Sequence, residues 1–251
     1  MNRSNSFTCF GLNITAEPQA SILKEIENRV QQKLSTWIVT ANPEILLLAK
    51  KRPSYWEILQ KASLRIVDGT GLLLCGWLEG KQATRFTGVE LSNALVEICL
   101  KNNWSIGLIG GGKKIAEKAS WNLKHKYPNL KIITENGGRI DELGNFLDKE
   151  AEDSVIRLRE YQPDVLLVAF GQLKQDFWIY KHNFEFPETK VFVGVGGTFD
   201  FWSGNIKRAP KIFQFFGLEW LWRLIKEPHR WKRILNATII FPLSIFKEKF
   251  F

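Results

Sequence analysis

Small polar and acidic residues recur where apolar, strand-like runs of this sequence end. The groups that follow these runs are Thr40 to Glu44, Asp68 to Gly71, Gly110 to Gly112, Gly171 to Asp176 and Gly194 to Thr198. In an open parallel sheet, ligands bind outside the carboxyl ends of the strands. We therefore expect these groups to converge on one edge of a sheet and to form a single site there.

Asp68 directly follows the apolar run 64–67 and precedes Gly69 and Gly71. A carboxylate on a turn above a cleft can act as a general base towards a hydroxyl group. Aspartate is also a good helix cap, and a helix is expected to begin at Thr70. From the residues alone, both roles stay open.

Glycine-rich turns follow two of the strand-like runs. In "GLIGGGKK" (107–114), glycines let backbone N–H groups approach a phosphate at the start of a helix. This segment matches neither the Walker pattern nor G-x-G-x-x-G, so a tight strand-to-helix turn explains it equally well. Gly196 and Gly197 follow the run 190–195 in the same way.

Polar side chains on two other segments suit a phosphate or a sugar hydroxyl. Thr40 and Asn42 alternate on one extended stretch, so both are expected to face the same cleft. Asn42 precedes Pro43, however, and can equally be a helix N-cap. Gln175 and Asp176 lie in the first turns of a later helix, where they either reach the cleft or cap and solvate that helix.

Arginine is the expected partner of any phosphate charge. Arg85 offers a guanidinium group for a diphosphate, although a surface ion pair with Glu90 is the alternative. No D-x-D sequence occurs, so a Mg²⁺ or Mn²⁺ site of the usual sugar-nucleotide type is not supported. The histidines His125, His182 and His229 follow no zinc-site spacing.

The elements that must position these residues alternate along the chain. Buried strands are predicted over 35–40, 64–67, 104–110, 130–134, 164–170 and 190–195. Helices are predicted over 18–34, 43–51, 70–78, 88–102, 112–126, 147–161 and 172–183. This alternation predicts an α/β fold: a Rossmann-like, mostly parallel sheet with helices on both faces.

The positive charge is concentrated at the end of the chain. The net charge is +9, and residues 206–251 hold ten Lys and Arg against three Glu, whereas residues 1–205 hold 25 basic and 23 acidic residues. We therefore divide the chain into an α/β catalytic domain (1–205) and a basic helical appendage (206–251). Cys9, Cys75 and Cys99 are too widely spaced for a disulfide framework and are interpreted as buried cytosolic thiols.

The appendage has the pattern of helices that lie on a membrane surface. Apolar residues repeat at helical spacing in two stripes: Leu218, Leu221, Trp222 and Ile225, then Trp231, Ile234 and Leu235. Interfacial tryptophans beside basic residues suit an anionic leaflet, and we favour this over packing on the body. No apolar run approaches the roughly 18 residues of a membrane span, and no signal peptide is expected.

Taken in chain order, these segments resemble the WecG/TagA/CpsF family of bacterial glycosyltransferases. The matching segments are "TANPE", "VDGTG", "RFTGVEL", "PDVLLVAFGQLKQDFWI", "VGVGGTFDFWSGNIKRAP" and "GLEWLWRLIKEPHRWKR", and they extend over almost the whole chain. Leu173 stands where the family usually has proline, and Asp176 where it usually has glutamate. The end segments are the most specific part of the match.

The resemblance implies an inverting transferase that uses neither a metal nor a cofactor. It would move an N-acetylmannosamine-type sugar from a UDP donor to polyprenyl-diphosphate-linked N-acetylglucosamine, in cell-envelope polysaccharide or teichoic acid synthesis. Asp68 would deprotonate the acceptor hydroxyl. The other implied site residues line the pocket or bind substrate: Thr40, Asn42, Gln175, the glycines Gly110, Gly111, Gly112, Gly196 and Gly197, and, at the diphosphates, Arg85, Arg223, Arg230 and Arg233.

The implied partners are therefore a UDP-sugar, a lipid-linked sugar and an anionic membrane, and an oligomer is compatible with the sequence. We expect a cytoplasmic protein bound peripherally to the inner face of the cell membrane. Two alternative enzymes stay open: a family member that uses another UDP-sugar, such as the uronic-acid form, and a nucleotide-cofactor oxidoreductase. A nucleic-acid-binding role is not expected, because the body outside the appendage is near neutral.

Overall fold

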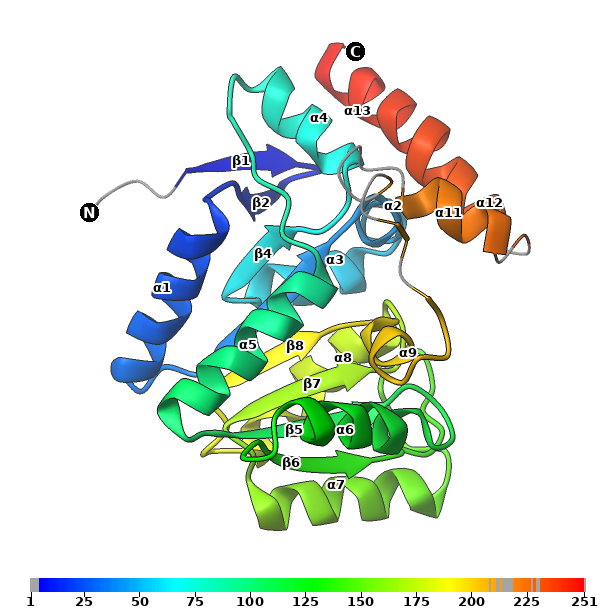
Figure 1. Cartoon of the computed structure of the whole chain (residues 1–251). Helices are drawn as coiled ribbons and strands as arrows, with labels where there is room; N and C mark the ends of the chain where they lie inside the picture. Colours follow the sequence, from blue (N-terminus) through cyan, green and yellow to red (C-terminus); the bar gives the residue numbers. More distant parts are fainter. Residues whose placement is uncertain are drawn as a thin grey trace.

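The computed structural model is built on one eight-stranded, mostly parallel sheet (Figure 1). It describes residues 5–207, 209–210, 213, 219–226, 228 and 231–250, without the side chains of 219, 223, 226 and 250. The strand order is β1-β2-β4-β3-β8-β7-β5-β6, and only the β1–β2 pair is antiparallel. The strands are β1 (Ser6–Cys9), β2 (Leu12–Thr15), β3 (Thr36–Ala41), β4 (Leu64–Val67), β5 (Ser105–Gly110), β6 (Lys131–Glu135), β7 (Val165–Ala169) and β8 (Val191–Gly194).

Helices cover both faces of this sheet, as the alternating pattern predicts. One face is packed by α1 (Gln19–Gln31), α5 (Gly88–Asn102), α6 (Ile115–Lys126) and α9 (Thr198–Trp202). The other is packed by α2 (Pro43–Lys51), α3 (Pro53–Lys61), α4 (Gly71–Leu78), α7 (Lys149–Tyr161) and α8 (Lys174–His182), which continues into the short helix η1 (Asn183–Glu185). The predicted Rossmann-like α/β fold is confirmed.

The core divides into two layers because side chains alternate along each strand. In β7, Leu166 and Val168 face the layer that contains α2, α3 and α8. Val165 and Leu167 of the same strand face the layer that contains α1, α5 and α6. All four side chains are fully buried. A strand buried on both faces needs a continuous apolar run, which is why these runs could be read directly from the sequence.

Helix starts near the sheet edge are set by local capping. The Asn42 side chain accepts hydrogen bonds from the N–H groups of Glu44 and Ile45 at 3.1 Å each, and Pro43 occupies the first turn of α2. Thr87 and Glu90 form a reciprocal capping box at the start of α5. These caps fix where α2 and α5 begin, and both helices begin at the edge where β3 and β4 end.

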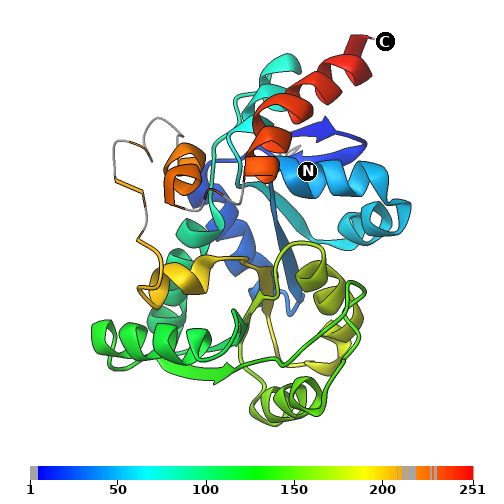
Figure 2. The ribbon, with the colours of Figure 1, turned by 90° about the vertical axis from the view of Figure 1, so that its right-hand side faces the viewer.

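The C-terminal helices pack on the body. They are α11 (Glu219–Lys226), α12 (Trp231–Leu235), a π-helical turn η3 (Asn236–Ile240) and α13 (Phe241–Phe250). Figure 2 shows α13 lying across the end of the molecule, beside α4 and the β1–β2 hairpin. Phe241 is completely buried and meets the ring of Phe10 edge-on, with ring centroids 5.6 Å apart. The boundary at residue 205 stays a prediction.

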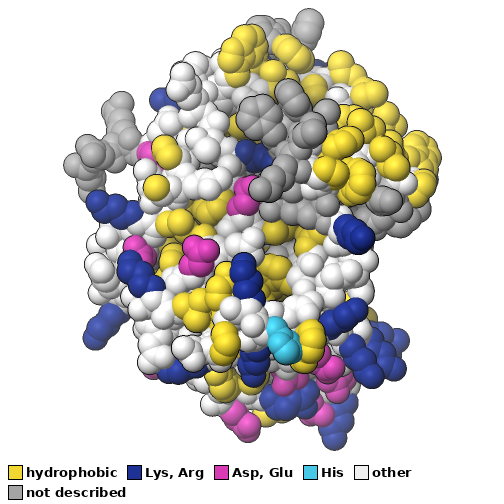
Figure 3. Space-filling model, in the orientation of Figure 1, with side chains coloured by type: hydrophobic (Ala, Val, Ile, Leu, Met, Phe, Trp, Pro, Cys, Tyr) yellow, Lys and Arg dark blue, Asp and Glu magenta, His cyan; other side chains and the backbone are white. Residues whose placement is uncertain are grey.

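Much of the outward surface of these helices is apolar. Large exposed side chains include Ile225, Trp231, Ile239, Leu243 and Phe246. Figure 3 shows hydrophobic side chains gathered over this end of the molecule. None of the helices in the described ranges is both long and apolar enough to cross a membrane.

The three cysteines are buried free thiols, as predicted. Cys9 of β1 and Cys75 of α4 lie side by side, with their sulfur atoms 2.7 Å apart. They join the N-terminal hairpin to α4 beneath α13, so they belong to the packing of this end of the molecule.

Candidate active site

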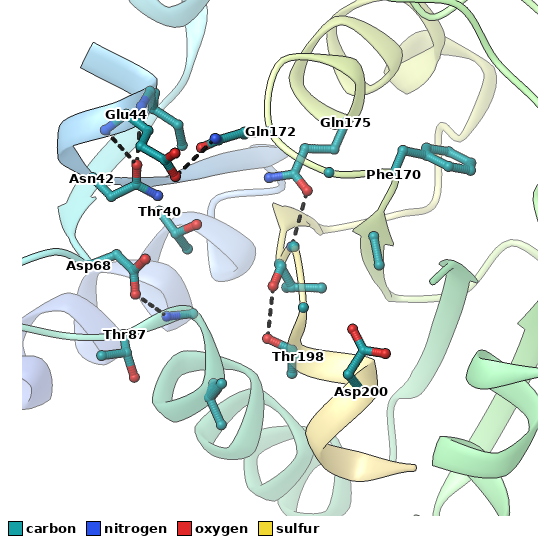
Figure 4. Close-up of a pocket in the computed structure, with 18 of the residues that line it drawn as sticks. Thr40, Asn42, Glu44, Asp68, Thr87, Phe170, Gln172, Gln175, Thr198 and Asp200 are labelled. Atoms are coloured by element: carbon teal, nitrogen blue, oxygen red, sulfur yellow. Dashed lines mark hydrogen bonds between the residues drawn. The ribbon is translucent and has the colours of Figure 1, made fainter. Parts of the chain in front are cut away.

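The carboxyl ends of six parallel strands open into one large pocket of about 980 Å³ (Figure 4). This volume is at the upper end of the range that is usual for ligand sites. The pocket is lined by the predicted residues Thr40, Asn42, Asp68, Arg85, Gly110, Gly111, Gly112, Gln175, Gly196, Gly197 and Arg233. The expected convergence of strand-end residues on one edge is therefore found.

Asp68 lies in the turn after β4 and lines the pocket. Its Oδ1 atom accepts a hydrogen bond from the backbone N–H of Gly88 at 2.9 Å. Gly88 is the first residue of α5, and Thr70 at the start of α4 has no side-chain cap. Asp68 thus binds the positive end of α5 and does not cap the helix that follows it in sequence. Its carboxylate is held at the edge of the pocket.

Thr40 and Asn42 lie on the same side of the pocket, as predicted. The Thr40 hydroxyl donates to the carbonyl oxygen of Gly194 at 2.9 Å, which connects the ends of β3 and β8. Asn42 caps α2, as the sequence allowed, and also lines the pocket. Both side chains stabilise the backbone of the pocket wall as well as facing its interior (Figure 4).

Gln175 connects the start of α8 to the glycine turn after β8. Its side chain is almost completely buried, and its Oε1 atom accepts a hydrogen bond from the N–H of Gly196 at 3.1 Å. The Gln175 side chain also packs against Gly194, where an added Cβ would come within 2.5 Å of Nε2. The glycine at position 194 therefore makes room for Gln175.

The second glycine turn, after β5, has a backbone that only glycine adopts easily. Gly110, Gly111 and Gly112 have φ values of 94°, 80° and 90°. Gly111 donates its N–H to the carbonyl oxygen of Ala169, whereas a Cβ on Gly112 would meet nothing within 4 Å. The turn therefore leaves open space beside its backbone, as a phosphate contact requires.

The arginines predicted at the diphosphates are only partly within the described structure. Arg85 lines the pocket from the segment between α4 and α5. Arg233 of α12 lines it from the appendage. Arg223 lies in α11 without a described side chain, and Arg230 lies outside the described residues.

Arg233 makes a two-pronged ion pair with Glu44 of α2. Its Nε donates to Oε1 and Oε2 of Glu44 at 2.8 and 3.1 Å, and its Nη2 donates to Oε2 at 2.7 Å. Gln172 donates to the same Oε2 atom at 3.0 Å. The body and the appendage therefore meet at the pocket through complementary charges.

Comparison with known proteins identifies the family of this chain. The model of the WecG/TagA/CpsF family of glycosyl transferases matches residues 7–251. The chain belongs to this family. The enzyme is a glycosyltransferase, and the resemblance carried by the strand-end motifs is confirmed.

Curated relatives cover most of the chain. A protein of Staphylococcus aureus (strain MRSA252) is 35% identical over 222 residues, which are 87% of this chain and 83% of the relative. A protein of Staphylococcus aureus (strain MW2) is 34% identical over the same shares. Both are named N-acetylglucosaminyldiphosphoundecaprenol N-acetyl-beta-D-mannosaminyltransferase.

One residue of the glycosyltransferase motif lies away from the predicted positions. Asp176 was expected either to reach the cleft or to cap and solvate α8. It does neither, so both expected roles are wrong. Its side chain is fully buried, and the Tyr55 hydroxyl donates to its Oδ2 at 2.6 Å. Burial raises the pKa of Asp176 to about 6, although the hydrogen bond from Tyr55 acts in the opposite direction. Asp176 thus connects α8 to α3 behind the pocket wall.

Leu173, two residues before Gln175, adopts a backbone that proline cannot. Its φ is 73° and its side chain is buried. Proline fixes φ near −65°, so the turn before α8 in this glycosyltransferase differs from one built around the usual proline. The change is confined to the approach to Gln175, which still reaches the glycine turn.

Several pocket residues of the glycosyltransferase were not singled out from the sequence. Thr87 and Asp200 line the pocket, from the start of α5 and from α9 (Figure 4). Asp200 lies in the first turn of the helix that follows the glycines after β8. This position close to a strand end could have marked it as a pocket residue from the sequence. Thr87 precedes a helix with Glu three residues later, the signature of a capping box.

The site as a whole combines the carboxylates of Glu44, Asp68 and Asp200 with glycine turns, amides and arginines. Such a set can accept a proton from a hydroxyl and bind the oxygens of a phosphorylated leaving group. Among the residues that the structure describes, no group of three or more His, Cys, Asp or Glu side chains is placed to hold a metal ion.

Proposed function

We propose that this glycosyltransferase moves an N-acetyl-β-D-mannosaminyl group from UDP-N-acetylmannosamine to polyprenyl-diphosphate-linked N-acetylglucosamine. The acceptor and the sugar are those in the names of the Staphylococcus aureus relatives, which match most of the chain. The observation that carries the proposal is Asp68, a carboxylate fixed at the edge of a large pocket.

The proposed reaction is a direct displacement with inversion at the anomeric carbon. The acceptor hydroxyl oxygen forms a bond to this carbon while the bond to the UDP oxygen breaks. Asp68 takes the proton of the attacking hydroxyl, and UDP leaves with the bonding electron pair. One general base and a stabilised leaving group are sufficient for this chemistry.

The UDP leaving group needs donors for the charge that develops on its diphosphate. The backbone N–H of Gly112 can supply one of them, because an added Cβ at this position would meet nothing within 4 Å. Arg85 and Arg233, which both line the pocket, supply guanidinium groups. Gln175 keeps the turn at Gly196 in position beside the sugar.

We propose further that the appendage rests on an anionic membrane surface at the inner face of the cell membrane. The support is the exposed apolar surface of α11 to α13, with Trp231, Ile239 and Leu243 beside the exposed residues Lys232 and Lys247. Apolar and basic side chains on one helical surface suit the headgroup region of a bilayer. Such an orientation brings the pocket close to the diphosphate of a lipid-linked acceptor.

The activity is tested with purified protein and a panel of UDP-sugars that includes UDP-N-acetylmannosamine and its uronic-acid form. A short-chain polyprenyl-diphosphate N-acetylglucosamine serves as acceptor. We expect UDP release and a disaccharide-lipid of the matching mass with the N-acetylmannosamine donor. Absence of turnover with every donor, or full activity of Asp68→Ala, would refute the proposal.

The membrane contact is tested by co-sedimentation with vesicles of mixed anionic and zwitterionic lipids. We expect the full chain to sediment with anionic vesicles and a Leu243→Ser/Trp231→Ser variant to remain in the supernatant. High salt should weaken the binding of the full chain, because part of the attraction is electrostatic. Equal sedimentation of the full chain and the double variant would contradict a role for this surface.

A further inference from the structure

Glu44 occupies a place where the body of the protein and the appendage meet at the mouth of the pocket. The residue lies in the first turn of α2, and its carboxylate receives three contacts of 2.7 to 3.1 Å from Arg233. The Glu44 side chain is only 15% exposed, whereas that of Arg233 is 47% exposed. The acid is therefore sheltered on the body, and the base reaches it from the appendage.

The Glu44 carboxylate is held in place independently of the appendage. The backbone N–H of Glu44 is bound by the Asn42 side chain, and a negative charge in the first turn of a helix is favoured by the helix dipole. Gln172, in the turn between β7 and α8, donates to Oε2 at 3.0 Å. Two separate segments of the body thus fix the group that Arg233 binds.

The geometry of the pair restricts the guanidinium plane. Glu44 engages Nε and Nη2 of Arg233 together, and a two-pronged contact fixes orientation as well as distance. A lysine or a singly bonded arginine would remain free to rotate. Arg233 is thereby kept on the lining of the pocket, where phosphate oxygens can approach.

A second ion pair between α2 and the appendage provides a contrast. Lys50 of α2 and Glu248 of α13 make a single contact at 2.8 Å, and both side chains are more than two-fifths exposed. Neither residue lines the main pocket. If ion pairs served only to attach the appendage, these two pairs would have the same functional effect.

Building on the proposed function, we propose that Glu44 is a positioning residue that orients Arg233 towards a substrate diphosphate. A diphosphate is present in the UDP donor and in the lipid-linked acceptor, and the same contact suits either. Loss of the Glu44 charge should leave Arg233 able to move away from the pocket. The effect should then appear in substrate binding, since Glu44 itself takes no part in proton transfer.

The kinetic test compares Glu44→Gln with Glu248→Gln, which removes the same charge from the other ion pair. We expect Glu44→Gln to raise the KM of one diphosphate substrate about five- to tenfold with kcat within about twofold, which corresponds to roughly 1 kcal/mol. Glu248→Gln should change neither constant by more than about twofold. The substrate whose KM rises identifies the diphosphate that Arg233 binds. Glu44→Asp, which keeps the charge but shortens the side chain, should give an intermediate KM.

A second test does not depend on turnover. Binding of inorganic pyrophosphate is measured by calorimetry, and hydrogen exchange is measured over residues 231–240. Glu44→Gln should weaken pyrophosphate binding about fivefold or more and speed exchange there, whereas Glu248→Gln should retain pyrophosphate affinity. Inactivity of the wild type with all donors would refute the proposed function alone. The role of Glu44 would be overturned if Glu44→Gln and Glu248→Gln changed KM and pyrophosphate affinity equally. It would also be overturned if Glu44→Gln lowered kcat alone, or if the wild type did not bind pyrophosphate.

Discussion

Asp68 accepts a hydrogen bond from the backbone N–H of Gly88 at 2.9 Å, which connects the end of β4 to the first residue of α5. The two residues are 20 positions apart, and the intervening chain carries α4 and Arg85 around the pocket. The bond fixes one carboxylate oxygen. It therefore orients the group that the proposed reaction uses as its base.

The first prediction separates this orientation from the chemistry. Asp68→Asn keeps an oxygen that can accept the Gly88 N–H but cannot take a proton, so kcat should fall by about 10²- to 10⁴-fold with little change in melting temperature. Steady-state UDP release and calorimetry measure the two effects. Asp164→Asn is the control, because Asp164 binds the backbone N–H of Ser105 at the opposite edge of the sheet. That variant should lose stability and keep kcat.

The second prediction concerns the contact between Gly194 and Gln175. Gly194→Ala would place a Cβ about 2.5 Å from the Gln175 amide, so this side chain must move and release the N–H of Gly196. We expect the KM of the UDP donor to rise at least about fivefold, on the order of 1 kcal/mol. Gly204→Ala provides the control, because a Cβ there has nothing within 4 Å and only the left-handed backbone is strained. An unchanged KM in Gly194→Ala would contradict the packing argument.

The third prediction follows from the buried carboxyl group of Asp176. Its pKa of about 6 lies above the ordinary value of an aspartate, so the folded protein binds more protons than the unfolded chain between about pH 4 and pH 6. The contribution of this group to folding stability is complete below pH 4 and is lost as the pH rises through 6. The size of the loss is at most about 3 kcal/mol, from roughly 1.4 kcal/mol for each unit of pKa.

Urea denaturation of Asp176→Asn and the wild type from pH 4 to pH 7 measures this effect. The difference in unfolding free energy between the two proteins should change across the window, because asparagine does not titrate. Tyr55→Phe removes the hydroxyl donor that favours the charged Asp176 carboxylate. The pH range over which the stabilising contribution of Asp176 is lost should therefore move to higher pH. Parallel curves for the wild type and Asp176→Asn would show that this carboxyl group does not titrate there.

Local patterns predicted most of the fold. The six predicted strands and seven predicted helices are all present, and the helices over 43–51 and 88–102 have the observed bounds. The β1–β2 hairpin was missed because its strands have four residues each and its turn contains Phe10 at a φ of 49°. A bulky residue in the left-handed region is not a turn signal. Helix α3 was missed as well, although Pro53 marks its start.

Most of the described residues that line the pocket were predictable from their positions at strand ends, whereas the long-range contacts of several of them were not. The positions of Thr40 and Asp68 at strand ends were enough to predict that both line the same pocket. Asp176 looked like a residue of the cleft, but Tyr55, 121 positions away, binds it behind the wall. The pair of Glu44 and Arg233 spans 189 positions. Such contacts depend on how helices pack across the sheet, and a single sequence carries no local pattern for them.

The last prediction tests how the appendage is attached. Phe241 is completely buried between Phe10 and Gly71, so Phe241→Ala should leave a cavity and lower the unfolding free energy by about 3 to 5 kcal/mol, unless α13 detaches first. Detachment would appear as rapid proteolysis within 231–250, while the body stays resistant. Leu243→Ala is the matched control, because Leu243 is 64% exposed on the same helix. That variant should keep its stability and protease resistance and lose only vesicle binding, since its side chain contributes to the outward apolar surface. If Phe241→Ala were as stable and as resistant as Leu243→Ala, α13 would not depend on this contact for its attachment to the body.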